Sequence, residues 1–180
     1  GSGSSTNMNA NEVFPNRAPE LLGAARGSRG TVHPNDHVNL GQSSNDVIPT
    51  ALHIAALLAI KEELEPAVGF LGAELAAKSR EFWGVIKTGR THLQDATPIR
   101  LGQEFSGYAG QMDHAVRRLR HASHELAFVA LGGTAVGTGI NTHPEFARRV
   151  LAIVAQEAGL ELTRTDNHLQ AQATIDAPVQ

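Results

Sequence analysis

The sequence contains no cysteine, so disulfide bonds, thiolate metal ligands and a cysteine nucleophile are all excluded. Aromatic residues make up only 4% of the 180 residues, whereas 41% are hydrophobic. This composition favours helices that pack closely through small side chains. No apolar run approaches the roughly 18 residues that a membrane-spanning helix needs, and residues 1–12 lack the apolar core of a signal peptide.

The chain also lacks an excess of positive charge. Its 15 lysines and arginines are outnumbered by 18 aspartates and glutamates, which gives a formal net charge of -3 and an isoelectric point near 6.3. A basic patch of the kind that binds nucleic acid is not visible. Any bound anion must therefore be held by local hydrogen-bond donors. We expect no nucleic-acid and no membrane partner.

Periodic apolar positions predict an all-α fold built from long helices of the kind found in bundles. The helices are expected over residues 7–25, 46–63, 67–82 and 98–129, and from 142–145 to about 158; the loops are expected over 1–6, 27–41, 87–97 and 132–139. Thr97 and Pro98 are predicted to cap and begin the longest helix, and Thr142 to cap the last one. No segment is dominated by strand patterns.

Two stretches, Gln42–Asp46 and Gly89–Asp95, concentrate small polar donors where helices are expected to begin. Helix N-termini present unpaired N–H groups and the positive end of the helix dipole, so they suit an anion. Ser43, Ser44 and Asn45 fit a carboxylate-binding cradle, and they equally fit an ordinary N-cap. Both interpretations stay open.

Histidines accompany two of the polar loops. His92 could hold or transfer a proton near neutral pH, or it could be a structural residue. His33 and His37 lie four residues apart, but Pro34 argues against a helix there, so a two-histidine metal pair is not expected. An Asx-type turn and an anion-contacting loop remain the alternatives for this segment.

The glycine-rich segment 132–139 does not follow a strand pattern, and it lacks both the GxGxxG and the GK[ST] signatures. It is therefore not predicted to bind a dinucleotide or a nucleotide. Tight backbone packing is the expected role. Asn141 could still reach a site, whereas Thr142 is explained as a cap.

Five ordered motifs closely resemble one known family, class II fumarase in the fumarase/aspartase superfamily. The motifs are Gly1–Ser4 with Asn7–Asn9, His33–Asp36, Ser43–Asp46, Gly89–Pro98, and Gly132–Gly139 with Asn141–His143. The resemblance runs from the first residue to about His168. Aspartase has glutamine at the position of His92 and differs at His143, so both residues point to fumarase. His37 replaces a more usual aspartate, and Ser4 replaces threonine but keeps the hydroxyl.

The resemblance implies a long-helix bundle in which residues 1–40 end an N-terminal helical region and residues 41–180 form part of the central bundle. It implies reversible hydration of fumarate to L-malate through an aci-carboxylate intermediate, without a metal or organic cofactor. Members of the family are homotetramers of the tricarboxylic acid cycle whose active sites are shared between subunits. We therefore expect a cytoplasmic protein, or a mitochondrial one in a eukaryote.

By resemblance, three groups of residues belong to the site. His92 assists proton transfer, as an acid or by ordering water. The substrate carboxylates are bound by Ser2, Ser4, Ser43, Ser44, Asn45 and Thr91. A secondary anion site near the entrance comprises His33, Asn35 and Asp36.

The base that the family uses does not occur in this sequence. It is a serine on a mobile Gly-Ser-Ser loop followed by lysine and asparagine, and no GSSxMPxKxN segment is present. We therefore expect an N-terminal-to-central fragment of a longer enzyme, inactive by itself. Two alternatives stay open: another lyase of the superfamily, such as an aspartase, and a helical assembly or anion-binding module without catalysis.

Overall fold

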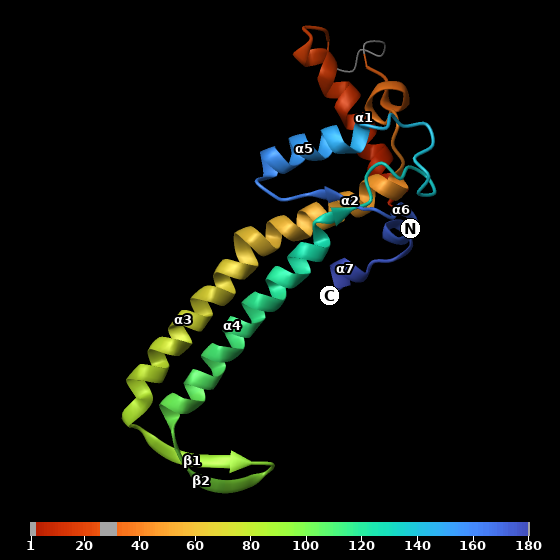
Figure 1. Ribbon diagram of the computed structural model, residues 1–180. Coiled ribbons are helices and arrows are strands. Elements are labelled where there is room, and N and C mark those ends of the chain that lie inside the picture. Colours follow the sequence, from red (N-terminus) through yellow and green to blue (C-terminus); the bar gives the residue numbers. More distant parts are fainter. Residues whose placement is uncertain (1–2, 26–31, 180) are drawn as a thin grey trace. The chain divides into compact units, whose positions relative to one another are not determined.

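The computed structural model describes residues 3–25 and 32–179, and most of them are helical (Figure 1). In chain order the elements are α1 (Ser4–Leu21), η1 (Pro34–Val38), α2 (Ser44–Ala59), η2 (Ile60–Leu64), α3 (Glu65–Glu81), η3 (Phe82–Gly84), β1 (Ile86–Thr91), β2 (Gln94–Arg100), α4 (Leu101–Leu126), β3 (Phe128–Val129), α5 (Phe146–Ala158), β4 (Thr163–Arg164), α6 (His168–Ala173) and α7 (Asp176–Val179). The predicted all-α fold is confirmed, with short strands as local exceptions. No helix among the described residues is long and apolar enough to cross a membrane.

The chain forms two compact units. The first comprises the chain up to Leu57 together with the chain from Glu125 onward, and the second comprises Leu58–His124. The division expected between residues 40 and 41 concerns a longer enzyme, and it stays a prediction.

Helix α1, in the first unit, begins earlier than predicted and contains its prolines. It starts at Ser4, directly after Gly3, whose φ of 75° is readily adopted only by glycine. The loop predicted over residues 1–6 is therefore wrong for residues 4–6. Pro15 and Pro19 lie inside one helix that ends at Leu21, somewhat before the expected end.

A helical turn, Pro34–Val38, lies within the predicted loop, so the argument against a helix at this point is wrong. Proline occupies the first helical position, where a missing N–H leaves no intrahelical hydrogen bond unmade. The imidazole of His33 supplies the cap, because its Nδ1 accepts the N–H of Asp36 at 3.2 Å. Sequence reasoning overlooked histidine as a capping residue.

Three asparagines join α1 to the segment after this turn. The side-chain amides of Asn7 and Asn11, both buried, donate to Oδ1 of Asn39 at 3.3 and 3.0 Å. Because the donors lie one helical turn apart, one acceptor can serve both.

The hydrophobic core of the first unit is small. Val129, Leu131, Ala147 and Leu151 are buried together, where the parallel pair β3–β4 meets α5. The predicted end of α5 is confirmed, since Gly159 adopts a left-handed φ of 60°.

Helix α5 does not begin where the sequence predicted, whereas the loop before it packs as expected. The expected cap by Thr142 is wrong, because α5 begins at Phe146 and its N-cap, Glu145, makes no side-chain cap bond. Tight packing of the glycine-rich loop is confirmed. A Cβ added at Gly132 would lie 2.8 Å from the Cβ of Ala147.

The helix predicted over 46–63 exists, but it does not end before Pro66. Helical angles continue through Leu64 and Glu65, and a π-helical turn carries α2 into α3. In that turn the N–H of Glu65 bonds to the carbonyl of Ile60, five residues back. The wider turn accommodates a proline that has no N–H to donate.

Residues 86–100 of the second unit form a β-hairpin, so the loop predicted over 87–97 is wrong. Strands β1 and β2 pair in antiparallel fashion, with Thr91 opposite Gln94 and a register shift between Thr88 and Arg90. His92 and Leu93 form the two-residue turn.

The predicted helix start at Thr97 and Pro98 is also wrong. Pro98 lies in β2, opposite Thr88, and α4 begins only at Leu101. A two-stranded ladder has an unpaired edge on each strand, and edges are where proline is tolerated in sheets.

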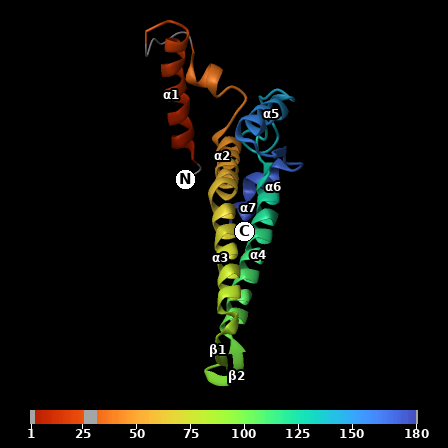
Figure 2. The same ribbon diagram turned by 90° about the vertical axis from the view of Figure 1, so that its left-hand side faces the viewer.

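Helices α3 and α4 run side by side in both views, with the hairpin joining them at one end (Figures 1 and 2). Gly102 allows the start of α4 to lie close to the chain at the end of α3, because an added Cβ would lie 2.9 Å from the Cα of Trp83. The buried hydroxyl of Ser79 donates to the carbonyl of Gly102 at 2.7 Å. Small residues therefore bring the two backbones together.

We predict opposite effects for two glycine substitutions in α4. Gly102→Ala should lower the free energy of unfolding by about 1–3 kcal/mol, because the methyl group forces the backbones apart. Gly107→Ala should raise it by about 0.5–1 kcal/mol, because no atom lies within 4 Å of an added Cβ and alanine favours the helix. Urea unfolding followed by circular dichroism measures both. Equal effects at the two positions would contradict the proposed close contact.

Candidate functional site

The N-terminus of α2 is capped by part of the predicted carboxylate cradle. The hydroxyl of Ser43 accepts the N–H of Asn45 at 3.2 Å, and the N–H of Ser43 donates to Oδ1 of Asp46 at 2.9 Å. These reciprocal bonds resemble a capping box, with aspartate in place of the usual glutamate and with the serine hydroxyl accepting the N–H two residues on instead of three. Capping thus accounts for Ser43, but it does not require Ser44 or the side chain of Asn45.

Two of the predicted substrate-binding serines lie together in the first unit. The hydroxyl oxygens of Ser4 and Ser44 are 3.1 Å apart, although 40 positions separate them in sequence. Gly3 allows this approach, since an added Cβ would lie 2.7 Å from Cγ2 of Ile48. Ser2 lies outside the described residues.

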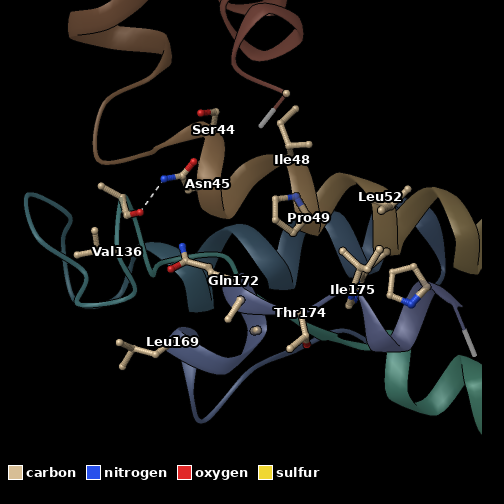
Figure 3. Close-up of a pocket in the computed structure, with 16 residues that line it drawn as sticks. Ser44, Asn45, Ile48, Pro49, Leu52, Val136, Leu169, Gln172, Thr174 and Ile175 are labelled. Carbon is tan, nitrogen blue, oxygen red and sulfur yellow. Dashed lines mark hydrogen bonds between the residues drawn. The ribbon is translucent and has the colours of Figure 1, made fainter. Parts of the chain in front are cut away.

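The side chain of Asn45 points to the glycine-rich loop, where its Nδ2 donates to the carbonyl of Ala135 at 2.7 Å (Figure 3). The same loop contacts Asp46, whose Oδ2 accepts the N–H groups of Gly132 and Thr134 at 3.0 and 2.9 Å. Sequence reasoning gave Asp46 no role of its own. The available signal was its spacing of three from Ser43, which is that of a capping box.

A pocket of about 540 Å³ lies beside these residues (Figure 3). Ser44 and Asn45 occupy one end, whereas Ile48, Leu52 and Ile175 line much of the rest. An apolar wall cannot compensate the desolvation of a carboxylate. Only the polar end therefore suits a small dianion, whereas the apolar lining of the rest of the pocket does not.

Thr91 and His92 belong to the second unit, where they end β1 and begin its turn. Both are exposed, and so is Leu93, whose φ of 53° places it in the left-handed region. A residue other than glycine pays about 1–2 kcal/mol there. Strain of this kind collects at functional sites, which draws attention to the turn that carries His92.

The base of this hairpin is fixed to α4 by an ion pair. Nζ of Lys87 lies 2.7 Å from Oε2 of Glu104, and the hydroxyl of Tyr108 donates to Oε1 of the same carboxylate at 3.0 Å. The hydrogen bond from Lys87, followed by that from Tyr108, lowers the pKa of Glu104. The same contact with Glu104 raises the pKa of Tyr108.

The residues of the predicted secondary anion site share the turn η1, where His33, Asn35 and Asp36 are all exposed. Nδ1 of His37 accepts the N–H of His33 at 2.8 Å, just as Nδ1 of His33 accepts that of Asp36. Nδ1 of His33 also lies 3.1 Å from Oδ2 of Asp36, so the backbone N–H and the carboxylate of Asp36 both meet this ring nitrogen. Within the described residues, no group of three or more histidine, aspartate or glutamate side chains could hold a metal ion.

Comparison with known proteins covers the whole chain. Residues 1–180 match a family model described as lyase. The chain is 57% identical over 177 residues to a class II fumarate hydratase of Halobacterium salinarum, and 58% identical over 179 residues to one of Nitrosomonas europaea. These alignments include 98% and 99% of this chain but only 37% and 39% of the relatives. The chain thus spans less than two fifths of their length.

Two solved structures likewise match nearly all of this chain but only part of their own length. A recombinant class II fumarase from Schistosoma mansoni superposes with a TM-score of 0.93 at 41% identity, over 98% of this chain and 40% of that one. A fumarate lyase:delta crystallin from Brucella melitensis bound to cobalt gives a TM-score of 0.93 at 47% identity, over 98% and 38%.

We predict that Lys87→Met raises the pKa of Glu104 toward its ordinary value, because the main partner of the carboxylate is removed. Tyr108→Phe should raise it less. Since the folded pKa is lowered, the ion pair stabilises the hairpin base above the ordinary carboxyl range, and this stabilisation is lost as the pH falls through the lowered pKa. Carboxyl NMR titration gives the values.

Lys78→Met is the matched control, because Lys78 pairs with Glu81 instead. An unchanged Glu104 titration in Lys87→Met would show that the ion pair does not form in solution.

Proposed function

Because this chain belongs to the lyase family along its full length, we propose that it is part of a longer protein that acts as a class II fumarate hydratase. The observation that carries the proposal is the 57–58% identity to relatives named as class II fumarate hydratases, over nearly every residue of this chain. The proposed reaction is the reversible addition of water to fumarate, which gives L-malate. The proposed setting is the cytoplasm, or the mitochondrion of a eukaryote, within the tricarboxylic acid cycle.

In the direction of elimination, a base removes a proton from C3 of malate and forms an aci-carboxylate. The hydroxyl group on C2 then leaves as water after it receives a proton. Negative charge builds up on the carboxylate beside C3, so preorganised donors around that group stabilise the transition state. No residue of this chain is assigned as the base.

The donors proposed for the substrate come from both units. Among the described residues, Ser4, Ser43, Ser44 and Asn45 belong to the first unit and Thr91 to the second, and Ser2 is proposed with them. Support comes from the hydroxyl of Ser44, which lines the polar end of the pocket with Asn45 and lies 3.1 Å from the hydroxyl of Ser4. For Ser43 the cap already uses the hydroxyl as an acceptor, but its O–H remains able to donate.

His92 is proposed to protonate the leaving hydroxyl, directly or through a water molecule. We further propose that the longer protein is a homotetramer in which neighbouring subunits complete each site. The exposed position of His92 at a hairpin tip, next to the left-handed Leu93, is consistent with a group that acts on a neighbouring subunit. His33, Asn35 and Asp36 are proposed to bind a second anion, and all three are exposed at one turn.

The decisive experiment uses the longer protein. Conversion of fumarate to malate is followed by loss of fumarate absorbance, and ammonia release from L-aspartate is measured in parallel. Hydration without ammonia release is the expected result. Ammonia release without hydration would replace the proposal with an aspartase, and inactivity toward both substrates would favour an assembly module.

In the longer protein we expect His92→Asn to lower kcat by about 100-fold or more, because general acid–base groups typically contribute that much. His121→Asn, an exposed histidine on α4, should leave the kinetics unchanged. Stopped-flow or steady-state assays across pH 6–9 compare the two. Retention of the wild-type pH profile in His92→Asn would remove His92 from proton transfer.

A further inference from the structure

The most completely enclosed charged group in the described part of the chain is the carboxylate of Asp46. Its side chain is 0% exposed, and three backbone N–H groups reach it at 2.9–3.0 Å. One of them comes from Ser43, which caps the same helix. The other two come from Gly132 and Thr134, which lie 86 and 88 positions away in sequence.

This arrangement exceeds what helix capping requires. A capping box uses the acidic side chain to accept a single N–H at the helix start. Here Oδ1 makes that bond, while Oδ2 binds a distant loop through two further N–H groups. The carboxylate therefore ties the loop to the first turn of α2.

A second bond crosses the same junction. Asn45, next to Asp46, donates from Nδ2 to the carbonyl of Ala135, one residue beyond Thr134. This bond fixes which way the amide group of Asn45 faces, and it leaves the carbonyl and one N–H of that amide free to bind a ligand. The loop position set by Asp46 thus sets the orientation of Asn45.

We propose that Asp46 is a positioning residue that holds Ser44 and Asn45 in the geometry needed to bind a substrate carboxylate, acting through the loop Gly132–Ala135. The inference rests on the proposed function, which places Ser44 and Asn45 on the substrate. Asp46 itself is fully buried and accepts three backbone N–H groups, so it acts on the site only through its neighbours. The three N–H dipoles offset part of its negative charge, which weakens its repulsion of an incoming dianion.

The test compares Asp46→Asn with wild type in the longer protein. The amide can still accept on one side but presents N–H groups on the other, so one of the two attachments is lost. We expect the KM for fumarate and the Kd for succinate, a saturated dicarboxylate, to rise about tenfold, because misplaced donors weaken carboxylate binding. Amide exchange should quicken at both Gly132 and Thr134, which share Oδ2 as their acceptor, or at Ser43 if the amide turns over. Asp113→Asn, an exposed aspartate on α4, is the matched control.

A purely structural role gives a different result. Partial unfolding lowers the amount of active protein, so the apparent kcat falls while KM and Kd stay unchanged, and that outcome overturns the proposal. If Asp46→Asn does not fold, Gly133→Ala takes its place. The added Cβ would lie 3.0 Å from side-chain atoms of His168 and Gln172, which displaces the loop from its other side. Its KM and Kd should rise together, and unchanged values would equally overturn the proposal.

The same measurements distinguish failure of the proposed function from failure of the positioning role. A wild-type protein that binds succinate but does not hydrate fumarate rejects the proposed function, and the succinate constants then decide the role of Asp46. A wild-type protein that hydrates fumarate, with a variant of unchanged KM, rejects only the positioning role.

Discussion

The buried carboxylate of Asp46 is the interaction on which the first unit depends. It completes the cap of α2 and attaches the glycine-rich loop to that cap. Without it, three N–H groups would lose their acceptor, and each buried polar group left unpaired costs about 1–3 kcal/mol. Such a loss is large against the 5–15 kcal/mol typical of a whole domain. The hydrophobic core beside it is small, so these buried hydrogen bonds add to the few apolar contacts that order this unit.

Features set by local physical chemistry could be predicted from the sequence. The helices α2 and α3 follow from apolar periodicity, and the end of α5 follows from Gly159. The tight packing of the glycine-rich loop also follows from its composition. The polar motifs were sufficient to indicate the family, and the match along the whole chain agrees with that interpretation.

Features that depend on contacts between distant segments could not be predicted. The hairpin was missed because its strands are polar and lack an apolar alternation, while Thr97 and Pro98 imitate a helix start. Asp46 was missed because two of its partners lie almost half the chain away. The pairing of Ser4 with Ser44 likewise requires the folded backbone. The roles of the site residues remain predictions, since sequence motifs name them but no ligand contact tests them.

The β1–β2 hairpin is anchored at its base and exposed at its tip. A strand of six residues spans about 20 Å, and a two-stranded ladder by itself is marginally stable in water. Lys87 and Glu104 hold its base, whereas His92 occupies its tip. If the proposed function holds, the proton donor acquires its final position only when another surface receives the tip. Dilution should then lower the specific activity before any helical structure is lost. The reason is that separated subunits would no longer hold His92 in place, although each chain stays folded.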